Sequence, residues 1–198
     1  MAHDGIDVLT PLVCRLVHGG AITLSATGIA TGNMNPHENS AAARELPRLT
    51  KLLYQQIAAS RLWYEMIVSI PTGGDEYALR LAALIKENEG RDIPCVPYKC
   101  LSPCEERRKR VLLVDDAIAF GTTATLAIQV ARMFGYEVAA IAVGLDFERD
   151  LATAVKREAT FYAALTAERA NKAFVAEIER LRASRRRFLR QFVRPFVE

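Results

Sequence analysis

Two adjacent acidic residues stand between an apolar run and a loop that ends in glycine and hydroxyl residues. Residues 111–114 are apolar, Asp115 and Asp116 follow, and the loop closes with Gly-Thr-Thr at 121–123 before an Ala-rich segment. Glycine lets successive backbone N–H groups face a ligand, a helix N-terminus favours negative charge, and threonine hydroxyls bind phosphate oxygens. Carboxylates at the end of a parallel strand accept hydrogen bonds from ribose hydroxyls or bind Mg²⁺. The segment is therefore suited to a phosphorylated sugar with a metal ion.

The alternative for this segment is a strand that ends in a solvated acidic pair before a capped helix. The whole strand, loop and helix pattern agrees with a ligand site, which favours the binding interpretation. A second loop, Ser-Ile-Pro-Thr-Gly-Gly at residues 69–74, stands about forty residues earlier, between an apolar run and a predicted helix. Its backbone amides can hold pyrophosphate, although taken alone it reads equally well as an ordinary turn.

The elements that would position these loops alternate between strands and helices. Strands are predicted over residues 66–70, 93–98, 110–115 and 137–145, and helices over 76–86 and 122–134. Upstream, helices are predicted over 6–17 and 41–59, joined by a strand and loop over 19–36. This alternation predicts an α/β fold with a parallel sheet flanked by helices.

The chain changes character after residue 150. Ala, Glu, Lys and Arg dominate from residue 151 without a turn signal before Pro195, which predicts one or two helices. We therefore expect an α/β domain over residues 1–150 and a helical extension over 151–198. Seven arginines and three glutamates lie between residues 177 and 198, so this tail accounts for the formal net charge of +3.

The helical extension carries an apolar stripe beside its basic face. The stripe consists of Phe174, Ile178, Leu181, Phe188 and Phe192. Packing against the body or against a second subunit explains it most simply. A nucleic-acid contact through the arginines is the less favoured alternative.

Composition is ordinary for a globular protein, with 51% apolar and 25% charged residues. No apolar run approaches the roughly 20 residues of a membrane span, and Asp4 and Asp7 stand where a signal peptide would be basic. We expect a cytoplasmic protein with no membrane contact. Cys95, Cys100 and Cys104 lack paired zinc-ligand spacing, so buried or incidental thiols are favoured over a metal site.

At residues 111–123 the sequence closely resembles the phosphoribosyl pyrophosphate motif of type I phosphoribosyltransferases. Residues 69–74 resemble the pyrophosphate loop of that family, and together with residues 20–25 they are similar to orotate phosphoribosyltransferases in particular. The resemblance covers residues 6–146. It implies the type I phosphoribosyltransferase fold, phosphoribosyl pyrophosphate and a nucleobase as substrates, Mg²⁺ as cofactor, and a homodimer.

The resemblance also assigns roles to residues. Asp115, Asp116 and Lys99 are expected to be catalytic, and the two aspartates are expected to hold the metal. Phosphoribosyl pyrophosphate is expected to contact Thr72, Gly73, Gly74, Asp115, Asp116, Ala117, Ala119, Phe120, Gly121, Thr122 and Thr123. The nucleobase is expected at Asn33 and Phe147; Asn35 lies nearby, and turn formation explains both asparagines equally well.

The sequence departs from the family pattern at residues that would bind the base and the pyrophosphate. Residues 98–109 form a short interval in which Lys99 takes the place of the first basic residue and no histidine follows. Ile29 and Phe147 stand where the family has basic side chains, which argues against orotate because its carboxylate would lack a cationic partner. Ala119 and Phe120 replace threonines of the phosphate loop.

Two functions therefore stay open. The first is an enzyme that transfers phosphoribose to a nucleobase, which the acidic pair and the Gly-Thr-Thr loop favour. The second is a non-catalytic regulatory module that binds phosphoribosyl pyrophosphate or a nucleotide, which the short basic interval favours.

Overall fold

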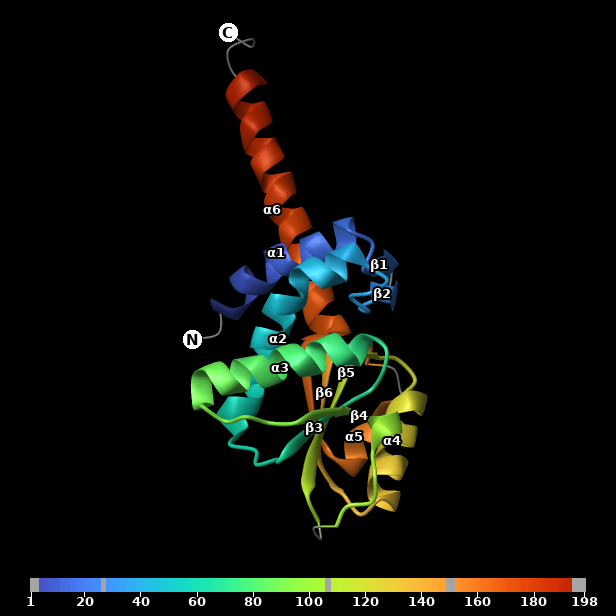
Figure 1. Ribbon diagram of the computed structural model, residues 1–198. Coiled ribbons are helices and arrows are strands. Elements are labelled where there is room, and N and C mark those ends of the chain that lie inside the picture. The colour runs from blue at the N-terminus through green and yellow to red at the C-terminus, as the bar shows by residue number, and fades with distance from the viewer. Residues whose placement is uncertain (1–3, 26–27, 106–107, 149–151, 194–198) are drawn as a thin grey trace.

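A five-stranded parallel sheet forms the centre of the computed structural model, which describes residues 4–25, 28–105, 108–148 and 152–193 (Figure 1). The strand order is β4-β3-β5-β6-β7. Their bounds are β3 Met66–Ser69, β4 Cys95–Pro97, β5 Arg110–Ile118, β6 Glu137–Asp146 and β7 Thr160–Thr166. Because every pairing is parallel, the carboxyl ends of all five strands meet at one edge.

Helices cover both faces of this sheet because its central strands are apolar on both sides. On one face α2 (Ser40–Ser60) and α3 (Gly73–Glu89) bury Leu112 and Val114. On the other, α4 (Thr122–Met133) and α5 (Thr153–Glu158) bury Val111 and Leu113. Side chains alternate between faces along a strand, so consecutive residues of β5 enter different cores.

A smaller unit lies beyond the carboxyl edge of the sheet. It contains α1 (Asp4–His18) and an antiparallel pair, β1 (Ile22–Ser25) and β2 (Gly28–Gly32). Helix α6 (Ala167–Val193) packs its first turns against α1 through Ala170 and Ala173 and then extends away from the body (Figure 1).

Two elements differ from the sequence expectations, one in its type and one in its length. Residues 160–166 were expected to be helical, but they form β7, which pairs with β6 from Ala140↔Thr160 onward. The sheet therefore runs past the boundary expected at residue 150. Strand β5 was expected to end at Asp115 but continues to Ile118, because its last residues still pair with β6.

The remaining elements lie where they were predicted, within a few residues, and 19–36 contains two strands in place of one. The side chains of Ile29, Phe188, Phe192 and the arginines from Arg185 onward lie outside the described residues. Among the helices that are described, none is long and apolar enough to cross a membrane.

Candidate functional site

Three chain segments meet at the carboxyl edge of the sheet. The 71–74 loop follows β3, the acidic pair lies in the last part of β5, which leads into the 119–123 loop, and Phe147 follows β6. The register places Ser69 beside Val114 and Ile118 beside Asp146. Most residues that the sequence singled out are thus brought together at one edge, the usual ligand position of open α/β sheets.

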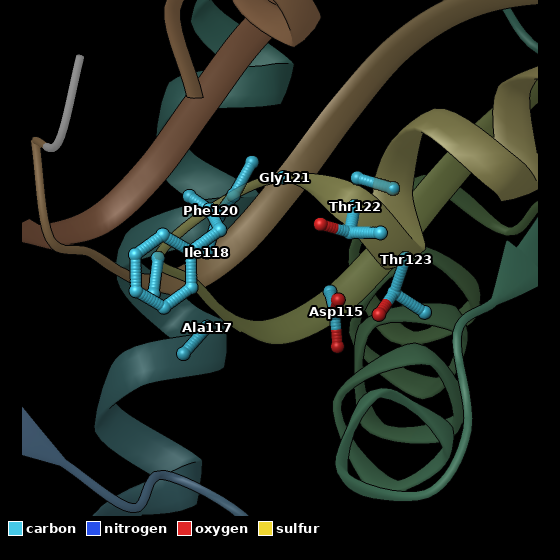
Figure 2. Close-up of a pocket in the computed structure, with 9 residues that line it drawn as sticks. Asp115, Ala117, Ile118, Phe120, Gly121, Thr122 and Thr123 are labelled. Atoms are coloured by element: carbon cyan, nitrogen blue, oxygen red, sulfur yellow. The ribbon is translucent and has the colours of Figure 1, made fainter. Parts of the chain in front are cut away.

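A pocket of about 250 Å³ opens between the end of β5 and the start of α4. It is lined by Asp115, Ala117, Ile118, Ala119, Phe120, Gly121, Thr122, Thr123 and Ala124. Figure 2 shows the hydroxyls of Thr122 and Thr123 on the same side as the Asp115 carboxylate, with the Phe120 ring at the opposite end of the loop. The positive end of α4 and these hydroxyls are chemically suited to a phosphate group.

The turn into α4 depends on Gly121. Its φ of 78° lies in the left-handed region, where a side chain is strained. A Cβ atom there would also lie 2.8 Å from Cγ2 of Val155, so α5 supports the loop from behind. On the same helix, Lys156 forms an ion pair with Asp146, a residue that is only 4% exposed. The loop thus rests on a short helix that is anchored to the end of β6.

The acidic pair is largely buried and holds itself in place through backbone donors. The N–H of Asp116 donates to Oδ1 of Asp115 at 2.8 Å, and the N–H of Ala117 donates to Oδ1 of Asp116 at 2.9 Å. Burial raises the pKa of Asp115 well above its ordinary value, and the charge of Asp116 raises it further. Burial also raises the pKa of Asp116. Two ionised carboxylates here are unfavourable unless a cation or hydrogen-bond donors join them.

The 71–74 loop packs directly on this pair. A Cβ atom on Gly73 would overlap the Asp116 carboxylate, and one on Gly74 would lie 2.5 Å from the carbonyl oxygen of Val114. Both glycines are therefore needed for α3 to begin against the end of β5. The Pro71–Thr72 peptide bond is cis.

Asn35 holds Thr72 in this loop. Its Nδ2 donates to Oγ1 of Thr72 at 2.9 Å, and its Oδ1 accepts from the N–H of His37 at 3.0 Å. Asn35 is 7% exposed, so its amide is fixed by both contacts. The sequence placed Asn35 only as a possible base contact, and no local pattern links it to a residue 37 positions away.

The two residues expected at the nucleobase lie near each other. Phe147 is half-buried, and a Cβ atom on Gly32, the neighbour of Asn33, would lie 3.1 Å from its Cζ. The Asn33 side chain forms a turn: Nδ2 donates to Glu38 at 2.9 Å and Oδ1 accepts from the N–H of Asn35 at 3.0 Å. The Asn33 side chain thus stabilises a turn, which is the alternative role expected for this asparagine.

Lys99 lies at the same edge of the sheet but is not among the residues that line the described pocket. It belongs to the short helix η1 (Tyr98–Cys100) after the edge strand β4, and its Nζ lies 5.9 Å from the centroid of the Tyr98 ring. Among the described residues, Cys95, Cys100 and Cys104 form no disulfide bond, and burial raises the pKa of Cys95 to about 11. Within the described residues, no group of three or more His, Cys, Asp or Glu side chains is arranged to bind a metal.

Comparison with known proteins finds a relative among the orotate phosphoribosyltransferases. The chain is 31% identical over 159 residues to the orotate phosphoribosyltransferase of Pyrobaculum aerophilum, a match that covers 76% of this chain and 82% of that protein. No family model matches the chain.

Solved structures show the same fold at lower identity. The orotate phosphoribosyltransferase of Aeropyrum pernix matches with a TM-score of 0.60 and 19% identity, over 80% of this chain and 96% of that one. The Mycobacterium tuberculosis enzyme in complex with 5-phospho-alpha-D-ribosyl 1-diphosphate matches with a TM-score of 0.59 and 22% identity, over 81% and 97%. Leishmania donovani UMP synthase matches with a TM-score of 0.62 and 18% identity, over 92% of this chain but only 42% of that longer protein.

Proposed function

The chain belongs to the orotate phosphoribosyltransferase family of type I phosphoribosyltransferases, and we propose that it transfers the phosphoribosyl group of phosphoribosyl pyrophosphate to a nucleobase. In this reaction the bond from ribose C1 to pyrophosphate breaks and a bond from C1 to a base nitrogen forms. The base nitrogen gives up its proton to the departing pyrophosphate or to solvent, and pyrophosphate and a nucleoside monophosphate are released. The observation that carries the proposal is the packing of the 71–74 loop on Asp116 beside a pocket that Asp115 and the 119–123 loop line.

Each segment has a separate task in this proposal. The 5′-phosphate binds at the start of α4, where backbone N–H groups and the hydroxyls of Thr122 and Thr123 face the pocket. Asp115 and Asp116 accept hydrogen bonds from the ribose hydroxyls. The backbone amides of the 71–74 loop, with Thr72, hold the departing pyrophosphate. Catalysis is then mainly positional and electrostatic.

Mg²⁺ fits this donor set. Two carboxylates with pKa values raised by burial favour a nearby cation, and carboxylate oxygens are the ligands that Mg²⁺ prefers. When bound, Mg²⁺ would neutralise charge on the pyrophosphate. Asp115 and Asp116 would hold it through water or directly, with substrate oxygens completing the shell.

The acceptor is proposed to be an uncharged nucleobase. Phe147 lies beside Gly32 at the expected base position and offers an apolar ring. An orotate carboxylate buried against this ring would lose hydration without gaining a charge partner from Phe147 itself. A neutral pyrimidine or purine avoids this cost.

A second candidate is a non-catalytic module that binds the same sugar phosphate. The position of Lys99 favours it, since this side chain lies over Tyr98 and outside the described pocket lining. We also propose a homodimer and a cytoplasmic location, both of which follow from the family and stay open to test.

The decisive assay uses Mg²⁺, phosphoribosyl pyrophosphate and a panel of orotate, uracil and purine bases, with released pyrophosphate as the readout. Turnover with an uncharged base and none with orotate is the expected result. Binding of phosphoribosyl pyrophosphate by calorimetry without turnover on any base would select the second candidate. Absence of binding would overturn both.

Variants of the acidic pair test in the same experiment whether these two residues belong to the binding site. The double variant Asp115→Asn with Asp116→Asn is expected to fold and to lose sugar-phosphate binding. Asp92→Asn is the matched control, because its carboxylate is 81% exposed and forms an ion pair with Lys86 on the surface. Unchanged binding in the double variant would remove both aspartates from the site.

A further inference from the structure

Tyr77 has a fully buried side chain whose hydroxyl makes no hydrogen bond. The residue is 0% exposed. Among the described residues, its Oη is the one buried side-chain oxygen or nitrogen that has no hydrogen-bond partner. Leaving such a hydroxyl unpaired is unfavourable, so it calls for a specific explanation. The donor is also available, because a phenol carries its proton at neutral pH.

The hydroxyl end of Tyr77 lies beneath the acidic pair. Tyr77 is on α3, one turn after Gly73, and its ring packs against Gly144 of β6. A Cβ atom at Gly144 would lie 2.6 Å from Cζ of Tyr77 and 2.6 Å from the carbonyl oxygen of Asp116. Burial raises the pKa of Tyr77, and the charge of Asp116, ahead of that of Asp115, adds to the rise.

Asp116 is the acid on the same side of the sheet as Tyr77. Val114 belongs to the core beneath α3, and Leu113 to the core beneath α4. Side chains alternate along the apolar part of β5, so Asp116 is expected on the α3 side. The contact between Asp116 and Gly73, the first residue of α3, agrees with this assignment.

We propose that Tyr77 is a positioning residue that donates a hydrogen bond to the Asp116 carboxylate when a sugar phosphate and Mg²⁺ occupy the site. In the structure Oδ1 of Asp116 accepts from Ala117, and Oδ2 lies against Gly73. In this proposal, ligand binding turns the Asp116 carboxylate so that one of its oxygens accepts a hydrogen bond from the Tyr77 phenol. The hydrogen bond then fixes the carboxylate and compensates its burial in the ligand-bound state. This inference rests on the proposed function.

The test is Tyr77→Phe, which removes only the hydroxyl. Without ligand, the variant is expected to melt at the same temperature as the natural protein or higher, because an unpaired buried hydroxyl is lost. With Mg²⁺, its affinity for phosphoribosyl pyrophosphate and ribose 5-phosphate is expected to fall about tenfold or more by calorimetry. A purely structural hydroxyl would give the reverse pattern, a lower melting temperature with unchanged affinity, and would overturn the proposal.

Two comparisons make the result specific. Tyr64→Phe is the matched control, a buried tyrosine (2% exposed) away from the pocket, and its ligand affinity is expected to be unchanged. In an Asp116→Asn background, Tyr77→Phe is expected to cause little further loss, because both changes remove the same contact. Fully additive losses would overturn direct coupling. If the natural protein binds neither ligand, the proposed function falls with this inference; if it binds both and Tyr77→Phe binds equally, only this inference falls.

Discussion

The Asp116 carboxylate lies against the backbone of Gly73 so closely that a Cβ atom on this glycine would overlap it. The contact joins two loops that stand far apart in the sequence. One is proposed to hold the pyrophosphate and the other to hold the ribose. The contact between this glycine and this carboxylate therefore adds to the β3–β5 pairing in setting the relative position of the two loops.

Gly73→Ala is expected to separate these loops. The added methyl group must displace either the carboxylate or the start of α3, so affinity for phosphoribosyl pyrophosphate should fall at least tenfold by calorimetry, the cost of about one charged hydrogen bond. Leu79→Ala, at a 57% exposed position of the same helix, should leave affinity unchanged. Adding Asp116→Ala should restore the stability lost in Gly73→Ala but not the affinity; if stability is not restored, the methyl group does not act through the carboxylate.

Asp115→Asn is expected to stabilise the protein without ligand at neutral pH. The pKa of Asp115 is raised in the folded protein, so the folded state holds its proton more tightly than the unfolded state, and the stability of the natural protein falls as pH rises from about 4 through the raised value. The asparagine variant lacks this loss. Its advantage in melting temperature should be absent near pH 4 and present at neutral pH.

Bound ligand should reverse the order of the melting temperatures of the natural protein and Asp115→Asn. With Mg²⁺ and phosphoribosyl pyrophosphate at neutral pH, the natural protein should gain melting temperature and Asp115→Asn should not, because binding to the folded state alone is stabilising. Asp92→Asn should follow the natural protein in both conditions. An Asp115→Asn variant that is less stable at every pH would contradict burial of an uncompensated charge.

The sequence predicted the parts of the site that lie within one stretch of chain. An apolar run, two acids, a glycine and two threonines suffice to place β5, its loop and α4, because the turn and helix start are encoded locally. The same local reading placed the 71–74 loop after a strand. Family resemblance then joined the two.

The sequence did not predict features that depend on contacts between distant residues. Residues 160–166 stand among helix-forming residues, and only pairing with β6 makes them a strand. Asn35 and Tyr77 are ordinary residues of a turn and a helix in the sequence. Their importance arises from Thr72, 37 positions from Asn35, and from Asp116, on another element.

Asn35→Ala is expected to weaken pyrophosphate binding more than it weakens the fold. It removes the donor that holds Thr72, so affinity for inorganic pyrophosphate with Mg²⁺ should fall about two- to tenfold, the worth of one neutral hydrogen bond. Asn39→Ala is the control. Asn39 caps α2, and its loss should cost about 1 kcal/mol of stability with no change in affinity. Equal affinities in the two variants would show that Thr72 needs no support from Asn35.

Lys156→Met is expected to destabilise the protein through Asp146. The variant leaves the carboxylate of this residue, which is 4% exposed, without its cation, at a cost of up to about 3 kcal/mol in denaturant unfolding. Asp146→Asn in the same chain should recover most of this cost. Because α5 supports Gly121, ribose 5-phosphate affinity should fall in the single variant and return in the double variant. Independent, additive effects of the two changes would contradict the pairing.

Phe120→Thr is expected to improve phosphate binding. The Phe120 side chain is 54% exposed and lies at the pocket, where the family has a threonine, so the change adds a hydroxyl donor and removes little core contact. Affinity for ribose 5-phosphate should rise about two- to tenfold, with unfolding free energy changed by no more than about 0.5 kcal/mol. Leu126→Thr, at a 47% exposed position of α4, controls for the loss of an exposed apolar side chain. A fall in affinity would mean instead that the aromatic ring itself contacts the ligand. Calorimetry with inorganic phosphate, which has no base or sugar for a ring to stack on, separates a hydroxyl effect on the phosphate from a ring contact with the rest of the ligand.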